Sequence, residues 1–149
     1  MHRDNNAVFL DWFHNDSPEA FNTVKVVFMK EFNELEHTFG GRTRAYCTNN
    51  GYCASKKGVK AWTTGAEPLS SFYCPLFFKG IPEKNERLCG VGDRAGVLMH
   101  DLSHVFAYTK DWEYGVHKSK ALPACKALEN ADTYMFYAKG KFRPWRTTS

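Results

Sequence analysis

Apolar residues recur at helical spacing in the first third of the chain. Ser17, Pro18 and Glu19 have the residue types of a helix N-cap, a first helical position and an acidic first turn. Apolar side chains then follow at intervals of three and four residues, the period of one helix face: Phe21, Val24, Phe28, Phe32 and Leu35. The pair Gly40-Gly41 is typical of a helix end. We therefore expect one helix here, with this stripe facing the core.

The pattern shortens between residues 43 and 79. Segments Arg44–Cys47 and Tyr52–Ala54 flank a turn that contains Asn50-Gly51, a strong β-hairpin signal. Two further short strands are expected at Val59–Thr63 and Phe72–Cys74. A loop should follow, because three residues that interrupt regular structure come next: Pro75, Gly80 and Pro82. These segments predict a small antiparallel sheet.

The last third of the chain is helical again. From about Asp93 to Val105 the pattern is nearly all apolar, which predicts a buried helix. Three polar residues interrupt it: His100, Asp101 and His104. A loop from Tyr108 to Lys118 should separate this helix from a last one, which begins near Ser119 or Leu122 and ends at Tyr137.

Length and composition fit one folded domain. The chain has 149 residues, of which 43% are hydrophobic and 15% aromatic. The net charge is +4, but the basic residues are scattered, so nucleic acid is not an expected partner. No apolar run reaches the roughly 18 residues of a membrane span. We predict a single, mainly helical α+β domain with a small antiparallel sheet, in four parts: 1–42, 43–92, 93–138 and a tail, 139–149.

Five cysteines leave at least one without a partner: Cys47, Cys53, Cys74, Cys89 and Cys125. A bridge between Cys47 and Cys53 would staple the predicted hairpin, and one between Cys74 and Cys89 would close the following loop. The close spacing of cysteines such as Cys47 and Cys53 favours a secreted protein with disulfides over an intracellular protein with free thiols, although no signal peptide is visible. No Cys-x-x-Cys pair supports a cysteine zinc site.

His100 and His104 carry the clearest chemical signal. Residues four apart share one helix face, so both imidazoles can reach one metal ion, as in the zinc-binding His-Glu-x-x-His helix. The alternative is a pair of core histidines satisfied by hydrogen bonds. Burial of a polar group is costly unless it is paired or metal-bound, which favours the metal. Catalytic zinc takes three protein ligands, and Asp111 in the next loop can supply the third. Tyr114, beside the turn-forming Gly115, is suited to stabilise an oxyanion.

These segments resemble the aspzincin (deuterolysin-type) zinc endopeptidases. That family pairs His-Glu-x-x-His with a downstream Gly-Thr-x-Asp-x-x-Tyr-Gly segment, and here His100–His104 and Thr109–Gly115 stand in those places. Asn130–Tyr134 resembles the family's Asn-Ala-Asp-x-Tyr helix, and the cysteine-bearing hairpin and loop are also similar. The resemblance covers roughly residues 43 to 138.

The resemblance implies a role for each matched residue. His100, His104 and Asp111 would bind one Zn²⁺ per chain, and Tyr114 would stabilise the transition state. Asp132 would either orient a ligand or meet a basic substrate side chain. It also implies the bridges Cys47–Cys53 and Cys74–Cys89, and a secreted, monomeric endopeptidase that acts on peptides or proteins.

Asp101 departs from the family, which has glutamate as the general base at this position. The shorter side chain would leave its carboxylate roughly 1 to 1.5 Å further from a zinc-bound water. A displacement of that size can cost about a hundredfold in rate. Two functions therefore stay open: a zinc endopeptidase in which Asp101 is the base, or a catalytically inactive zinc-binding protein that captures metal or binds a partner. A further alternative is a structural domain that binds no metal and has neither function.

Overall fold

The computed structural model describes residues 5–36, 41–48, 51–65, 69–83 and 92–141. They form eight helices and three strands. The helices are α1 (Asn5–Phe13), α2 (Pro18–Glu36), α3 (Tyr52–Ser55), α4 (Pro75–Gly80), α5 (Arg94–Ala107), α6 (Val116–Lys120), α7 (Ala124–Ala127) and α8 (Ala131–Lys141). The strands are β1 (Arg44–Cys47), β2 (Ala61–Thr64) and β3 (Ser70–Tyr73). No helix in these ranges is long and apolar enough to cross a membrane.

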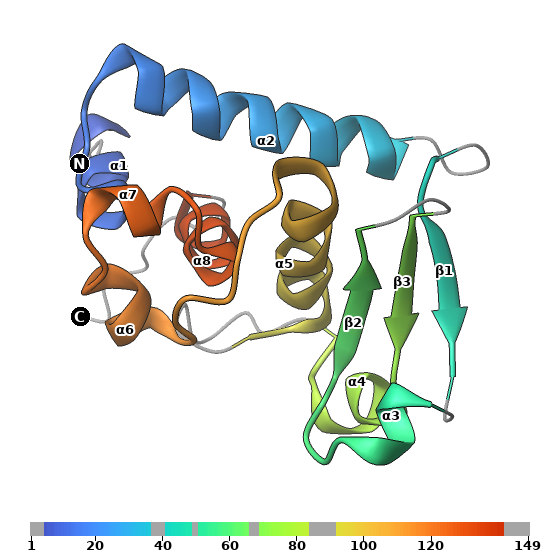
Figure 1. Cartoon of the computed structure of the whole chain (residues 1–149). Coiled ribbons are helices and arrows are strands. Elements are labelled where there is room, and N and C mark those ends of the chain that lie inside the picture. The colour runs from blue at the N-terminus through green and yellow to red at the C-terminus, as the bar shows by residue number, and fades with distance from the viewer. Residues whose placement is uncertain (1–4, 37–40, 49–50, 66–68, 84–91, 142–149) are drawn as a thin grey trace.

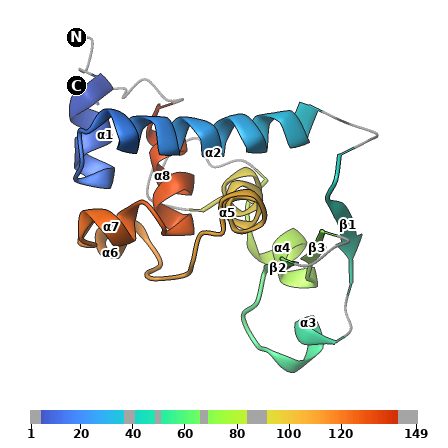
Figure 2. The ribbon, with the colours of Figure 1, turned by 45° about the horizontal axis from the view of Figure 1, so that its top comes forward.

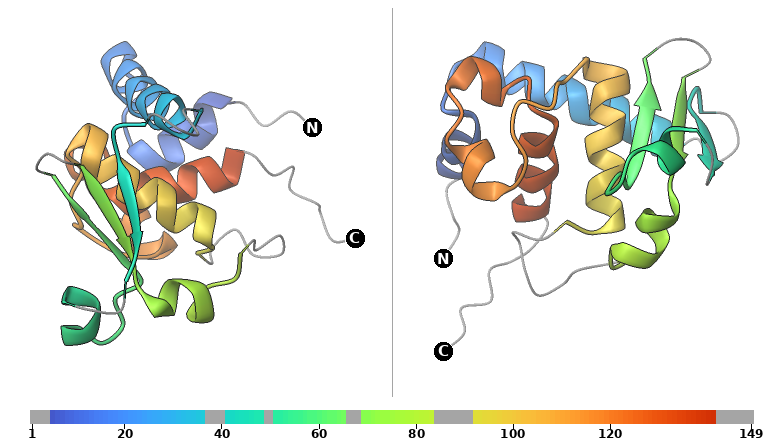
Figure 3. Two further views of the ribbon diagram at one scale, coloured as in Figure 1. Left: turned by 90° about the vertical axis from the view of Figure 1, so that its right-hand side faces the viewer. Right: turned by 60° about the horizontal axis from the view of Figure 1, so that its bottom comes forward.

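Helix α5 lies in the middle of the molecule. Figures 1 and 2 show the sheet on one side of it and α1, α6, α7 and α8 on the other, with the long α2 lying across both parts. Figure 3 shows the same arrangement from two further sides, with α8 next to α5. Val97 and Leu98 pack against a small core between the sheet and α4, and Ala107 packs against the main helical core. Contacts with both cores hold α5 firmly in place.

Helix α2 is confirmed, but its predicted core stripe is largely wrong. The hydroxyl of Ser17 accepts a hydrogen bond from the Ala20 backbone N–H at 3.1 Å, as an N-cap should. Val24 is buried, whereas Phe32 is 62% exposed and Leu35 50% exposed. The face that packs is a different one: Ala20, Val24, Val27 and Glu31. Because apolar residues cover more than one face of α2, periodicity alone does not decide which of them is buried.

The sheet is mixed rather than antiparallel throughout. Its strand order is β1-β3-β2, with β1 parallel and β2 antiparallel to β3. The predicted hairpin is wrong, since its second strand is the short helix α3; Asn50 of its turn lies outside the described residues. A parallel partner must come from a distant segment, which local turn signals do not reveal. The broader prediction of a mainly helical α+β fold is confirmed.

Both predicted disulfides are wrong. Cys53 in α3 is bonded to Cys74 at the end of β3, across a sequence separation of 21 residues. Cys47 is a free, exposed thiol, and so is Cys125. Cys89 lies outside the described residues, but its predicted partner is already used. The bridge follows from α3, which carries Cys53 away from β1 and to the end of β3.

Two helical segments also differ from prediction. The stretch that begins at Pro75 forms α4 rather than a loop, with proline at the start of the helix, where its missing N–H costs nothing. The predicted last helix is split into α6, α7 and α8, and interruptions occur at Pro123 and around Asn130. Helix α5 agrees with prediction, and Asp93 caps it by accepting a hydrogen bond from Gly96 N–H at 2.9 Å. Of the predicted tail, residues 142–149 lie outside the described residues.

Candidate metal centre

Three side-chain atoms from α5 and the loop after it converge on one point. The Nε2 atoms of His100 and His104 are 3.1 Å apart. Asp111 Oδ1 lies 3.0 Å from Nε2 of His100 and 3.3 Å from Nε2 of His104. A tetrahedral zinc ion with bonds of about 2.0–2.1 Å separates its ligand atoms by about 3.3 Å. The triangle therefore has the dimensions of a tetrahedral metal site.

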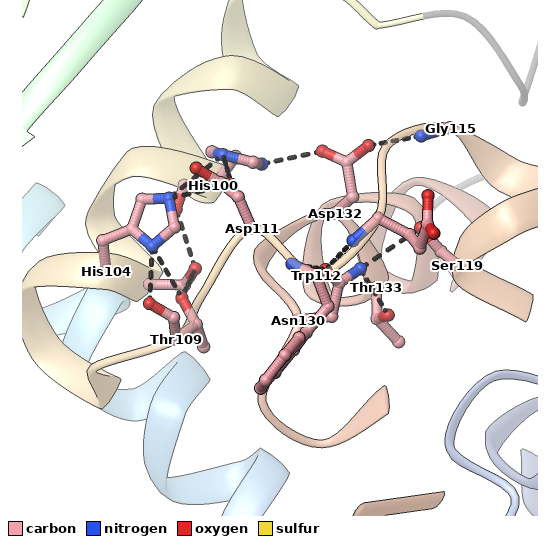
Figure 4. Close-up of polar contacts among 12 residues, drawn as sticks. His100, His104, Thr109, Asp111, Trp112, Gly115, Ser119, Asn130, Asp132 and Thr133 are labelled. Carbon is pink, nitrogen blue, oxygen red and sulfur yellow. Dashed lines mark hydrogen bonds and ion pairs between the residues drawn. The ribbon is translucent and has the colours of Figure 1, made fainter. Parts of the chain in front are cut away.

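The hydrogen bonds of the Nδ1 atoms of both histidines determine whether their Nε2 atoms are free to bind a cation. His100 Nδ1 lies 2.7 Å from Oδ1 of Asp132, and His104 Nδ1 lies 2.7 Å from the Thr109 carbonyl oxygen (Figure 4). Carboxylate and carbonyl oxygens only accept, so each Nδ1 carries the hydrogen and donates it. The two Nε2 lone pairs then face the Asp111 carboxylate. Three acceptors that face one another need positive charge between them, which a bound metal ion supplies and which a proton on His100 supplies when no metal is bound.

The electrostatics of the site also favour positive charge. Burial by itself lowers the pKa of His100, but the hydrogen bonds and charges of Asp111 and Asp132 raise it to about 9. Burial raises the pKa of Asp111, but hydrogen bonds with His100, His104 and Tyr114 hold it well below its usual range. Both shifts have the same origin, because the carboxylates stabilise a cation at the imidazoles.

Thr109 positions the loop that carries Asp111. Tyr108, the residue that caps the C-terminus of α5, has a left-handed conformation with φ 55° and ψ 32°, which turns the chain back toward the helix. The buried hydroxyl of Thr109 lies 2.7 Å from that of Ser103, while the Thr109 carbonyl accepts from His104. One residue thus anchors the loop and orients a histidine. The sequence pattern had not marked it for this role.

Asn130 fixes the other end of the same loop. Its fully buried side chain accepts hydrogen bonds from the backbone N–H groups of Trp112 at 3.0 Å and Glu113 at 3.1 Å. Its amide group donates to the hydroxyls of Ser119 and Thr133 (Figure 4). The side-chain amide of Asn130 thus makes all four of its hydrogen bonds, two accepted by Oδ1 and two donated by Nδ2. The sequence motif alone gives Asn130 no role, whereas its burial and its hydrogen bonds to Trp112 and Glu113 show that it anchors the loop.

Asp132 on α8 joins two parts of the site. Its Oδ1 accepts from His100, and its Oδ2 accepts from the Gly115 backbone N–H at 2.6 Å. Gly115 has φ 85°, a backbone conformation that glycine adopts without strain, as expected for a sharp turn beside Tyr114. Asp132 is 5% exposed, and both of its carboxylate oxygens accept a hydrogen bond. This geometry is that of a group that orients His100.

Asp101 and Tyr114 line the same cavity as the triangle. Asp101 follows His100 directly in the sequence and is buried. Its Oδ2 has no hydrogen-bond partner among the described residues. Burial raises the pKa of Asp101 to about 6, although the charges of His100 and His104 lower it. Tyr114 is exposed, and its ring stacks on that of His100 with centroids 5.9 Å apart. Burial and its hydrogen bond with Asp111 raise the pKa of the Tyr114 hydroxyl, which keeps it protonated.

A cavity of about 1080 Å³ opens over these groups. Strand β2 forms one wall with Trp62 and Thr63, and α5 and the loop of Asp111 form the opposite one. Because β2 is an edge strand, one side of its backbone has no strand partner among the described residues. An edge strand of this kind can accept an extended peptide as a further strand.

The sequence model of the aspzincin family, described as lysine-specific metallo-endopeptidase, matches residues 1–139. The chain belongs to the aspzincin family. The match begins at the first residue, well before the stretch from 43 to 138 in which the motifs lie, so α1 and α2 also belong to the aspzincin pattern. Membership in a family of metallo-endopeptidases implies a bound metal, and the triangle supplies suitable ligands for one.

Relatives of this aspzincin come from fungi. A neutral protease 2 homolog of Arthroderma gypseum is 32% identical over 146 residues, which cover 94% of this chain and 37% of that protein. One of Aspergillus fumigatus is 33% identical over 137 residues, covering 89% of this chain and 36% of that protein. The chain thus spans little more than a third of the length of these relatives. A zinc peptidase from Grifola frondosa has the same fold, with a TM-score of 0.68 at 21% identity; the match covers 95% of this chain and 80% of that one.

Proposed function

We propose that this aspzincin chain is a zinc endopeptidase, with one Zn²⁺ held by His100, His104 and Asp111. The observation that carries the proposal is the triangle of three acceptor atoms at separations of 3.0, 3.1 and 3.3 Å. The hydrogen bonds of the histidines with Thr109 and Asp132 also support the proposal. Each of these two residues accepts the Nδ1 hydrogen of one histidine, which leaves Nε2 available for the metal. The exposure of Asp111 leaves room for water and substrate on the open side.

Bound zinc would supply Lewis acidity, which polarises the scissile carbonyl and makes water a better nucleophile. Asp101 would accept the proton of that water at its Oδ2, which has no competing hydrogen bond among the described residues. Tyr114 would donate its hydroxyl hydrogen to the oxygen on which negative charge develops. Asp132 would hold His100 and the backbone of Gly115 in a fixed relation, so that the ligand and the tyrosine stay aligned.

The proposed substrates are peptides or unfolded protein segments. The edge strand β2 would pair with the substrate backbone, since it lines the cavity and has no strand partner on one side among the described residues. We propose that the enzyme is secreted and acts as a monomer. The Cys53–Cys74 disulfide supports an oxidising environment, in which such bonds persist.

Zinc content and cleavage test the two parts of the proposal separately. The wild-type protein should bind one zinc ion per chain, and His104→Ala should lose it, whereas His117→Ala should not, because that histidine is exposed and outside the triangle. Wild type should cleave an unfolded protein substrate, and a chelator should abolish the cleavage. Absence of zinc at stoichiometric level from the wild type would refute the metal site.

Substitutions of Asp101 test the base. Asp101→Ala should abolish cleavage while zinc binding persists, because Asp101 is no ligand. Asp101→Glu should raise the rate by up to about a hundredfold, since the longer side chain brings the carboxylate nearer to the water. If wild type binds zinc but cleaves nothing, and Asp101→Glu creates activity, the natural protein is a zinc-binding relative without protease function.

A further inference from the structure

We infer that the outer face of the sheet is an exosite, a surface that binds an acidic segment of a protein substrate outside the cleft. This face carries a row of stacked aromatic rings with cations beside it, and the row begins in the cavity over the metal triangle. The inference rests on the proposed function, because it names a class of substrate for that site. Binding to the surface can be measured without cleavage, so the two can fail separately.

The strand register defines which side chains share the outer face. Tyr73 of β3 belongs to the small core between the sheet and α4. Because side chains alternate along a strand, Phe72 points to the opposite, outer face. Tyr46 of β1 and Trp62 of β2 are the register partners of Phe72, so all three rings lie on this face. We call these three residues the aromatic row.

The aromatic row leads from the cavity to the far edge of the sheet. Trp62 lines the cavity together with Tyr52, and the centroids of these two rings are 5.6 Å apart. Figure 1 shows β2 next to α5 and β1 on the far side of the sheet, so the row runs away from the metal triangle. It spans two strand spacings, about 10 Å, which about three residues of an extended chain cover. A substrate that leaves the cleft beside Trp62 can therefore continue over the row.

The rings of the row stack on one another and present their edges outward. The centroid of Phe72 lies 4.0 Å from that of Trp62, at an interplanar angle of 8°, and 5.1 Å from that of Tyr46, at 17°. Both faces of the Phe72 ring are thus covered. Nucleic-acid bases stack on open ring faces, whereas ring edges carry the positive part of the quadrupole. The row is therefore better suited to carboxylates than to bases.

The segments that build this side of the molecule are strongly cationic. Residues 41–48, 51–65 and 69–80 hold six lysines or arginines and no aspartate or glutamate. The other residues of the chain hold 14 basic and 16 acidic side chains, so the positive net charge comes from these segments. Glu34 of α2 contacts the start of β1 through the backbone N–H groups of Arg42 and Thr43, which leaves the surface positive. Such a surface attracts an acidic polymer.

Two of these cations flank the aromatic row. Arg44 precedes Tyr46 by two residues, and Lys60, whose carbonyl accepts from Cys74 N–H beside β2, precedes Trp62 by two. Alternation puts each cation on the face of its neighbouring ring. Both are exposed, and neither forms an ion pair among the described residues. By contrast, four lysines of the helical part are paired with carboxylates: Lys110, Lys118, Lys120 and Lys139.

An uncleaved probe tests the surface by itself. The probe is a fluorescent peptide of about twelve residues, rich in glutamate, and its counterpart has glutamine at the same positions. Both are titrated with Asp101→Ala, which should leave them intact. We expect the glutamate peptide to bind at least about fivefold tighter at low salt, and the difference to vanish near 1 M salt, where the Debye length is about 3 Å. Equal affinities at low salt would overturn the inference.

Variants locate the binding on the outer face. Arg44→Gln/Lys60→Gln should remove most of the preference for glutamate, and Tyr46→Ser should weaken binding of the glutamate peptide about threefold. The control Lys25→Gln/Lys118→Gln, which neutralises two exposed lysines of α2 and α6, should keep the preference. An equal loss in both double variants, or full affinity in Tyr46→Ser, would overturn the exosite. So would an oligothymidine that binds this face when the glutamate peptide does not.

Cleavage by wild type separates the exosite from the proposed function. Substrates with one cleavage site carry a tail of about six glutamates or six glutamines, on one side of the site or on the other. The glutamate tail that leaves the cleft beside Trp62 should lower KM about fivefold with kcat unchanged, since the row touches no reacting atom. Equal KM for all tails would overturn the exosite and leave the protease intact. Selective binding of the glutamate probe without any cleavage would uphold the acidic-segment surface and refute the catalytic proposal.

Discussion

Glu31 has a buried carboxyl group whose surroundings disfavour its charged form. It lies on the packed face of α2, is 2% exposed, and neither side-chain oxygen has a hydrogen-bond partner among the described residues. Burial raises its pKa from 4.5 to about 8. The nearby hydroxyl of Tyr134 has a raised pKa, through burial and then the charge of Glu31. We predict that Glu31→Gln, which removes the ionisable proton but keeps the shape, stabilises the protein at neutral pH.

The magnitude follows from the two pKa values. The folded state holds the Glu31 proton up to about pH 8, while the unfolded chain releases it from about pH 4.5, so the folded state binds more protons between them. Stability must therefore fall as pH rises through this window and level off above it. At about 1.4 kcal/mol per pH unit, the loss reaches about 3 kcal/mol at pH 7. Glutamine, which stays neutral, escapes this loss.

Urea unfolding at several pH values measures this effect. The free energy of unfolding of Glu31→Gln should exceed that of wild type by less than about 1 kcal/mol at pH 5 and by about 3 kcal/mol at pH 7. Glu129→Gln is the matched control: that carboxyl is exposed, so its gain should stay near zero. A Glu31→Gln gain equal at pH 5 and pH 8, or a loss at pH 8, would refute a buried, unpaired carboxyl.

Three further variants test the elements around the site. Tyr108→Gly should stabilise the protein by about 1 kcal/mol in urea unfolding, because glycine relieves the left-handed backbone at the end of α5; Tyr108→Ala should bring no such gain. The double variant Cys53→Ala/Cys74→Ala should lose about 3 kcal/mol, by the entropy of the opened loop, and keep its zinc affinity in a chelator competition. Asn130→Ala should weaken zinc binding by at least about tenfold in the same competition, as the loop of Asp111 loses its anchor. Unchanged affinity would show that Thr109 holds the loop alone.

The parts of the molecule that follow local rules could be predicted from the sequence. Helix α5 and the shared face of His100 and His104 follow from helical periodicity over a few residues. Asp111 and the turn at Gly115 lie within a dozen residues of that helix, so their approach to it needs only a short loop.

The parts of the molecule that depend on contacts between distant segments could not be predicted from the sequence. The pairing of β1 with β3 and the Cys53–Cys74 bridge both join segments that no turn signal connects. The burial of Glu31 depends on what packs against α2, and a polar residue gives no periodic sign of it. The helix α1, which packs Phe9 against Phe21, was not predicted from the sequence either.

The proposed metal ligands and their supports come from one short stretch of chain. Residues 100 to 132 hold both histidines, the third ligand, the tyrosine and the aspartate that orients His100. By contrast, the residue after α1, His14, reaches Lys120 of α6, and these two residues are 106 positions apart. Closing a short loop costs less entropy than closing a long one, and local contacts form sooner during folding. Zinc should thus be able to bind before the N-terminal helices dock, and so to act as a nucleus for the folding of the C-terminal half.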